Sequence, residues 1–249
     1  MGGLKNRDLW RMAARTLLLQ ATFNYERQQG IGWAWALKPA LDRLYGEPAT
    51  RGERLAEHTA YFNTEPTLAS LVLGAAAGLE ERRAAGEGPD ADGMARVKSV
   101  LASSAAALGD RLFWFTLRPF AACLGVLCAL AGGWVGALVL WMVYNLVHQG
   151  VRFLGVHWGY REGPAVLSQG LRGRLEGLIR ALAISGAALV GVLTAMLLIP
   201  AGQPRSVSEQ ALLALGLLFG TVSAQRARPS PTVWALTIGA VSVLGVWLR

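Results

Sequence analysis

The stretch SVLASSAAALGDRLFWFTLRP, residues 99–119, leads directly into the longest uncharged segment of the chain, residues 119–147. Three charged residues, Asp110, Arg111 and Arg118, lie at the entrance to that segment. Charges at membrane depth are costly unless they are paired or used by the protein. We therefore expect the fold to be organised around this stretch and the function to be located there.

The composition is typical of an integral membrane protein. The 249 residues are 53% hydrophobic and only 16% charged, which is too apolar for an ordinary soluble domain of this length. The formal net charge is +8, but the arginines cluster in short loops between apolar segments, as cytoplasmic loops of membrane proteins do. This distribution argues against nucleic-acid binding.

The apolar segments predict an all-α, polytopic integral membrane protein with re-entrant or broken helices. Residues 119–147 are about 29 residues, near 43 Å if helical, which is longer than one perpendicular span requires. Gly132 and Gly133 divide this run into two pieces that are each shorter than the ~20 residues of a full span. A single long tilted helix is the alternative. Pro119 predicts a helix break at Arg118, because it disfavours helical backbone there.

Two basic segments predict interfacial amphipathic helices on the cytoplasmic side. The first covers residues 9–19, and the second lies within residues 161–180. In the second helix, Arg172, Arg174 and Arg180 are candidates for contact with lipid headgroups or a partner protein.

We expect one membrane-embedded domain over residues 1–249, with a cytoplasmic N-terminus and a C-terminus on the opposite side. Residues 66–79 are apolar but short, so they dip into the membrane or pack against protein. The expected parts are a polar, re-entrant N-terminal part (16–83), a loop (84–98), a core with broken helices (99–160), the interfacial helix (161–180) and C-terminal transmembrane helices (181–249, with spans at 181–201, 211–224 and 231–248).

Asp110, Trp114 and Arg118 follow one another at four-residue steps, so a helix places them within about 80° of each other. A carboxylate and a guanidinium beside an indole suit a sugar, because they combine charge-assisted hydrogen bonds with an aromatic plane for the apolar C–H face. The alternative is that Asp110 and Arg118 neutralise each other or cap broken helices.

Asn24 and Glu26 stand between aromatic residues in the segment 19–46. This segment is interpreted either as a surface helix with a solvated charged face or as a polar cluster that lines a membrane cavity.

The sequence lacks the common patterns of soluble enzymes. It contains no Gly-rich phosphate loop with Lys, no HExxH and no Cys-x-x-Cys. The three histidines, His58, His148 and His157, are too far apart in sequence to predict a metal site. We therefore expect no metal ligands and no cofactor.

Four longer segments carry a resemblance to a known family. They are LQATFNYERQQGIGWAWALKPALDRLY (19–45), YFNTEPTLASLVLGAAAGLEE (61–81), ALGDRLFWFTLRP (107–119) and NLVHQGVRFLGVHWGYREG (145–163). In content and order they resemble the IID component, a membrane subunit of the mannose/fructose/sorbose-family sugar phosphotransferase permeases.

The resemblance implies a bacterial inner-membrane subunit with no phosphorylated residue of its own. It would form, with a IIC subunit, the pathway that takes up a hexose such as mannose while IIA and IIB proteins phosphorylate it. The assembly would be a hetero-oligomer built on trimers. The residues that match the family's polar motifs, and are expected to line or gate the pathway, are Asn24, Glu26, Gly109, Asp110, Trp114 and Arg118.

The alternative function is a non-transporting membrane scaffold or regulatory paralogue that docks soluble phosphotransferase proteins. One departure bears on this choice. The residues Ser103–Leu108 replace a Gly-Pro-Leu-Ala-Gly type stretch that the family usually carries before the Gly109–Asp110 pair. Without that Gly and Pro, the element before Asp110 is expected to be more regularly helical, and the sugar site can differ from the family's.

Overall fold

The computed structural model describes residues 3–198, with Val207 and Ala214. The described part is helical, and its only β-type pairings are two isolated bridges. The chain divides into two compact units, residues 1–180 and 181–249. The all-α membrane fold expected from the sequence is confirmed, with two helices long and apolar enough to cross a membrane, Ala91–Gly132 and Gly170–Thr194.

The first unit begins with four short helices: α1 (Asn6–Arg15), α2 (Gly30–Leu44), α3 (Pro48–His58) and α4 (Ala69–Ala84). The apolar side of α1, formed by Leu9, Met12 and Ala13, is buried. It packs against α2 and α7, so this side of the amphipathic helix is covered by protein and is not free to insert into lipid.

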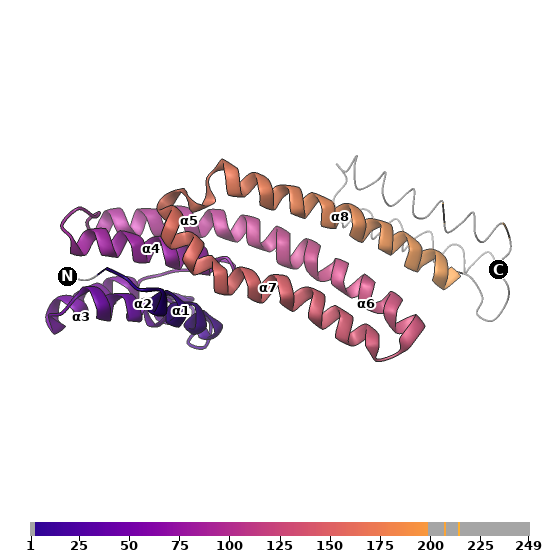
Figure 1. Ribbon diagram of the computed structural model, residues 1–249, viewed down its shortest axis with the longest axis horizontal. Coiled ribbons are helices and arrows are strands. Elements are labelled where there is room, and N and C mark those ends of the chain that lie inside the picture. The colour runs from indigo at the N-terminus through magenta and orange to yellow at the C-terminus, as the bar shows by residue number, and fades with distance from the viewer. Residues whose placement is uncertain (1–2, 199–206, 208–213, 215–249) are drawn as a thin grey trace. The chain divides into compact units, whose positions relative to one another are not determined.

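The second part of this unit is a long helical hairpin (Figure 1). Its first arm is a continuous 42-residue helix composed of α5 (Ala91–Gly109), a π-helical segment (Asp110–Leu117) and α6 (Arg118–Gly132). Gly133 adopts φ 59°, a left-handed conformation that favours glycine, and turns the chain into α7 (Val135–Glu162). The expected division at Gly132–Gly133 is confirmed, and a single helix through residues 119–147 is excluded. The expectation of two pieces shorter than a full span is wrong, because the first piece continues the helix from Ala91 and the second extends to Glu162.

The helix break expected at Arg118–Pro119 is wrong. Arg118 has helical backbone angles, φ −65° and ψ −49°, and α6 continues through Pro119. The π-helical segment directly before it explains this, because its wider turns change the hydrogen-bond pattern where a proline ring would otherwise clash. The Thr116 hydroxyl donates to the Arg111 carbonyl at 2.6 Å and satisfies an acceptor in this irregular stretch.

Helix α4 packs along α7, and small residues allow the close approach. A Cβ atom added to Gly74 would collide with the backbone of Val156, and one added to Gly159 would collide with the backbone of Leu71. The apolar segment 66–79 therefore packs against protein, which was one of its two expected placements.

After a short 3-10 helix (Gly163–Leu167), α8 (Gln169–Leu198) runs as one continuous helix. The expected interfacial helix and the first expected C-terminal span are thus not separated by a break. The expected spans at 211–224 and 231–248 lie outside the described residues, apart from Ala214.

Candidate functional site

The π-helical segment Asp110–Leu117 is the irregular point of the long helix, and such segments are frequent at functional sites. The helix before it, α5, is regular through Gly109, as expected from the Ser-Ala stretch that precedes Asp110. The segment has a buried side, which faces α7 and the chain before α4, and an exposed side.

Gly109 marks the buried side, since a Cβ atom there would lie 2.6 Å from the Glu65 Cβ and 2.9 Å from its Oε2. Glu65 is only 5% exposed. Its carboxylate accepts hydrogen bonds from the backbone N–H groups of Thr67 (2.9 Å) and Leu68 (2.8 Å), at the start of α4. Burial raises the pKa of Glu65 against the opposing effect of these bonds. Only glycine at position 109 lets the helix approach this carboxylate.

Two polar side chains of α7 complete the buried side. Arg152 is 8% exposed and donates from Nη1 to the Thr16 carbonyl at 3.2 Å. The His148 ring lies edge-on to Phe113, with centroids 5.5 Å apart, and stacks on Tyr144 at 5.2 Å. Within the described residues, Arg152 Nε and His148 Nδ1 have no hydrogen-bond partner. Buried polar atoms without partners are uncommon and mark places where a further group can bind.

The exposed side carries the predicted residues Asp110, Trp114 and Arg118. The Arg118 guanidinium lies over the Trp114 ring, 5.1 Å from its centroid. In the part of the chain that the structure describes, Asp110 and Arg118 form no ion pair. Among the described residues, the alternative in which these two charges neutralise each other is therefore not realised, and Asp110 is exposed.

Asn24 and Glu26 lie in a turn, not in a helix, since α2 begins only at Gly30. The Asn24 Oδ1 accepts from the backbone N–H groups of Glu26 (3.1 Å) and Arg27 (2.9 Å) and so stabilises the turn. The Glu26 side chain is 82% exposed. Of the segment 19–46, Gly30–Leu44 forms a helix, as one of the two interpretations expected, but Asn24 and Glu26 lie before it. No described hydrogen bond or ion pair joins these two residues to Asp110, Trp114 or Arg118.

The turn is nevertheless linked to the long helix through the chain before α4. The Gln29 amide exchanges two hydrogen bonds with the Thr64 backbone, at 2.8 and 3.1 Å. The Thr64 hydroxyl in turn donates to the Ala102 carbonyl of α5 at 2.7 Å. Residues 24–29, the Thr64–Glu65 pair and the Gly109 region therefore form one connected structure.

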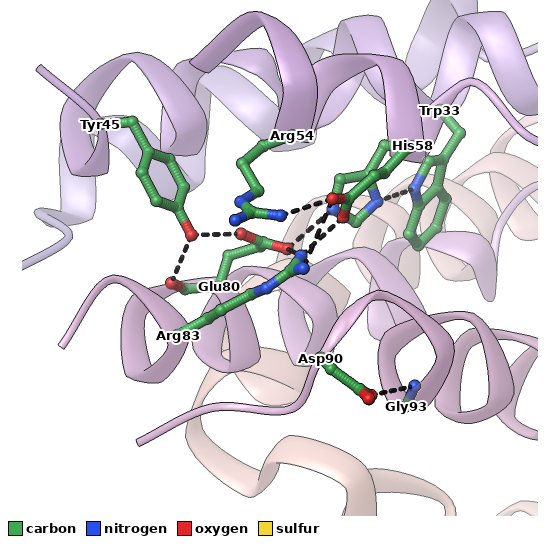
Figure 2. A network of polar contacts seen from close by, with 9 residues as sticks. Trp33, Tyr45, Arg54, His58, Glu80, Arg83, Asp90 and Gly93 are labelled. Atoms are coloured by element: carbon green, nitrogen blue, oxygen red, sulfur yellow. Dashed lines mark hydrogen bonds and ion pairs between the residues drawn. The ribbon is translucent and has the colours of Figure 1, made fainter. Parts of the chain in front are cut away.

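A second polar cluster joins α2, α3 and α4 around Glu80, which is fully buried (Figure 2). Its carboxylate accepts from Tyr45 Oη at 2.7 Å and lies 3.1 Å from His58 Nε2. The Trp33 indole donates to His58 Nδ1 at 3.4 Å, so Nε2 carries the proton and donates to Glu80. Burial lowers the pKa of His58, which keeps the ring neutral.

Arg83 extends this cluster to Glu57, 2.6 Å from its Nη1, and to Glu80 at 3.4 Å. Burial pushes the pKa of Glu80 upward, but hydrogen bonds from His58 and Tyr45 and the charge of Arg83 hold it below its usual value. This cluster was not predicted, because His58 stands alone in the sequence. A spacing of 22 residues between His58 and Glu80 gives no helical signal.

The basic residues Arg172, Arg174 and Arg180 are exposed in the first turns of α8. Arg172 pairs with Glu176 at 3.0 Å along the helix. As for metals, the described residues contain no group of three or more His, Cys, Asp or Glu side chains that could hold an ion.

Comparison with known proteins gives a consistent result. A family model described as "PTS system mannose/fructose/sorbose family IID component" matches residues 3–249. The fructose permease IID component of Bacillus subtilis (strain 168) is 33% identical over 190 residues, 76% of this chain and 69% of that protein. The mannose-specific EIID component of Escherichia coli (strain K12) is 34% identical over 191 residues, 76% of this chain and 68% of that protein.

Solved structures of membrane proteins are also similar to this chain. The cryoEM structure of the mannose transporter ManYZ in complex with microcin E492 contains a chain that is 27% identical, with a TM-score of 0.63 over 100% of this chain and 98% of that one. A second solved structure, of a membrane protein, gives a TM-score of 0.73 at 26% identity, covering 99% of this chain and 98% of that one.

Proposed function

Because this chain belongs to the family of IID components of the mannose/fructose/sorbose phosphotransferase systems, we propose that it forms, with a IIC subunit, the pathway for uptake of a hexose. IIA and IIB proteins would phosphorylate the hexose, and the assembly would be a hetero-oligomer built on trimers. The observation that carries this proposal is the family match over residues 3–249, together with the names of two relatives, a fructose permease component and a mannose-specific component.

The exposed side of the π-helical segment is the proposed contribution of this chain to the pathway. Asp110 offers an exposed carboxylate that forms no ion pair within the described part of the chain. Trp114 and Arg118 form a cation–π pair that presents an aromatic plane and five N–H donors. This chemistry suits a hydroxyl-rich ligand, and Gly109 fixes the segment against Glu65. Asn24 and Glu26 are proposed to act from the linked turn, at a gate or at the subunit contact.

The non-transporting scaffold is the second candidate, and the named relatives do not favour it because they are sugar-specific or permease components. It would use the exposed Arg172, Arg174 and Arg180 as a docking surface. The membrane orientation proposed from the arginine distribution places this surface and the N-terminus in the cytoplasm.

Uptake of radiolabelled hexoses tests the proposal in cells that produce this chain with its IIC, IIA and IIB partners. We expect Asp110→Asn and Arg118→Gln each to lower the initial uptake rate at least tenfold, about the worth of one charge-assisted hydrogen bond. The matched control is Arg96→Gln, an exposed charge on the same long helix.

Uptake at the wild-type rate in both site variants would overturn the assignment of the site. No uptake by the wild-type assembly, combined with tight binding of a soluble phosphotransferase protein that Arg172→Gln and Arg174→Gln abolish, would support the scaffold instead.

A further inference from the structure

A cavity of about 270 Å³ lies between the end of α3, residues 60–63 and the first half of α5. It is separate from the π-helical segment. Its wall includes His58, Phe62, Asn63, Lys98, Ser99 and Ser103. A water molecule takes about 30 Å³ in the liquid, so the cavity has room for a small organic molecule.

Lys98 is the unusual member of the wall, because its side chain is buried with only 7% exposed. Its ammonium group lies over the Trp33 ring at 5.3 Å and over the Phe62 ring at 5.9 Å. Within the described residues, the ammonium forms no hydrogen bond and no ion pair, although a lysine has three donors to satisfy.

The nearby carboxylates are already engaged. Glu57 pairs with Arg54 and Arg83, and Glu80 accepts from His58 and Tyr45 as well as lying near Arg83 (Figure 2). Both carboxylates attract the Lys98 ammonium, and Glu57 also lines the cavity. Their two charges are matched by Arg54 and Arg83, so the cluster together with Lys98 carries one positive charge in excess. Because Lys98 lines the cavity, this excess positive charge favours an anion there.

The rest of the wall indicates what kind of anion fits. Ser99 and Ser103 offer hydroxyl groups, and Asn63 offers an amide, which are partners for ligand hydroxyls. The Phe62 ring offers an apolar face, on which C–H groups of a sugar can pack. Lysine binds phosphate as a point charge.

We propose that this cavity is a binding site for a small phosphorylated sugar, with the phosphate on Lys98 and the hydroxyls on Ser99, Ser103 and Asn63. The sugar part of this assignment rests on the proposed function, in which a hexose phosphate is the product of uptake. The site is then a place where the product binds the membrane subunit outside the π-helical segment that is proposed to line the transport pathway.

Isothermal titration calorimetry on the purified complex of this chain with its IIC subunit tests the proposal. Three probes are compared: a hexose 6-phosphate, the neutral hexose and inorganic phosphate. We expect the hexose 6-phosphate to bind most tightly, and Lys98→Met to weaken its binding at least tenfold. Lys98→Arg should retain most of the affinity. Lys38→Met, which removes a half-buried lysine paired with Asp42 away from the cavity, should leave the affinity unchanged.

A second variant keeps the test valid if the Lys98 variants fail to fold. Ser103 is exposed at the cavity wall, so Ser103→Leu should fold normally while it fills the opening and weakens hexose 6-phosphate binding. Equal affinity of wild type, Lys98→Met and Ser103→Leu for hexose 6-phosphate would overturn the proposal, as would binding of the neutral hexose that Lys98→Met weakens equally.

Different results would refute the transport function and the hexose-phosphate site. Wild-type uptake without hexose 6-phosphate binding to the complex refutes this site and leaves the transport function standing. Lysine-dependent binding of the phosphorylated probe without any uptake supports the site and refutes the transport function.

Discussion

Glu80 is fully enclosed by protein and yet keeps its negative charge, because every side of its carboxylate meets a donor. A buried carboxylate is tolerated only under that condition. The cluster holds α2, α3 and α4 together through side chains, in a part of the unit where the helices are short and individually weak. Stability of the N-terminal helices should therefore depend strongly on this one residue.

Glu80→Ala leaves the His58 Nε2–H and the Tyr45 hydroxyl without an acceptor in a buried site. Removing one partner from a buried charged network costs about 3–5 kcal/mol, so we expect a lowered unfolding midpoint in detergent. Tyr45→Phe removes only the hydroxyl that donates to Glu80 and should cost about 1 kcal/mol. Glu87→Ala, an exposed control, should change little, and a Glu80→Ala midpoint equal to that control would contradict the structural role.

His58 gives the fold a pH dependence. Its folded-state pKa is lowered by burial, while the unfolded chain titrates near the ordinary value of about 6.5. As the pH falls below about 6.5, His58 binds a proton in the unfolded state but not in the folded state. The free energy of unfolding therefore decreases. The loss continues down to the folded-state pKa, with a slope of at most about 1.4 kcal/mol per pH unit.

Thermal unfolding of wild type and His58→Gln at pH 7.5, 6.5 and 5.5 measures this effect. The wild-type midpoint should fall more steeply over this range than that of the variant. The other histidines are common to both proteins and cancel in the comparison. Parallel curves would show that the folded state binds the proton as readily as the unfolded state.

At the scale of helices, the contact between α4 and α7 depends on glycines, because the absence of a side chain lets the backbone of the facing helix come close. Gly159→Leu places side-chain atoms where the Leu71 backbone lies, and the two helices must separate. Overpacking of this kind costs about 1–3 kcal/mol, which should lower the thermal unfolding midpoint.

The matched control is Gly150, on the same helix α7, where an added Cβ meets no atom within 4 Å. Gly150→Ala should be neutral or stabilise the helix by up to about 1 kcal/mol, since alanine is the better helix former. If Gly159→Leu also proved neutral, the close approach of the two helices would not be needed for stability.

At the scale of the whole molecule, the helix from α5 to α6 is about 63 Å long, more than the 40–45 Å thickness of a bilayer with its headgroups. Its two ends are therefore expected on opposite sides of the membrane. With a cytoplasmic N-terminus, the loop before α5 lies inside, because the Leu4 N–H donates to Glu81 Oε1 near that loop at 2.7 Å.

Cysteine labelling with a membrane-impermeant maleimide tests this topology, in a background with Cys123 and Cys128 replaced by alanine. Glu87→Cys should react only in inside-out vesicles. Trp134→Cys, at the exposed tip of the hairpin, should react only in right-side-out vesicles. Reaction of both positions from the same side would mean that the hairpin re-enters the membrane and that this helix does not cross it.

The sequence predicted the class of fold, the family and several boundaries, because these follow from composition, from apolar run lengths and from glycine. Gly132–Gly133 is the clearest case, since positive φ at Gly133 is a local property that needs no tertiary contact. Pro119 shows where prediction from local sequence fails. The backbone preference of proline predicted that the helix would end at Arg118, but the π-helical segment beside Pro119 removes the clash that would end it. That segment forms where Gly109 packs on Glu65.

By itself the sequence determined that this chain is a helical membrane protein of the IID family and that Asp110, Trp114 and Arg118 share one helix. Only the tertiary structure decided that Glu80 meets His58, and that Lys98 is buried without an ion pair to a carboxylate in the described residues. The physical reason is that helical periodicity fixes neighbours up to about four residues apart, whereas these burials arise where α3, α4 and α5 meet.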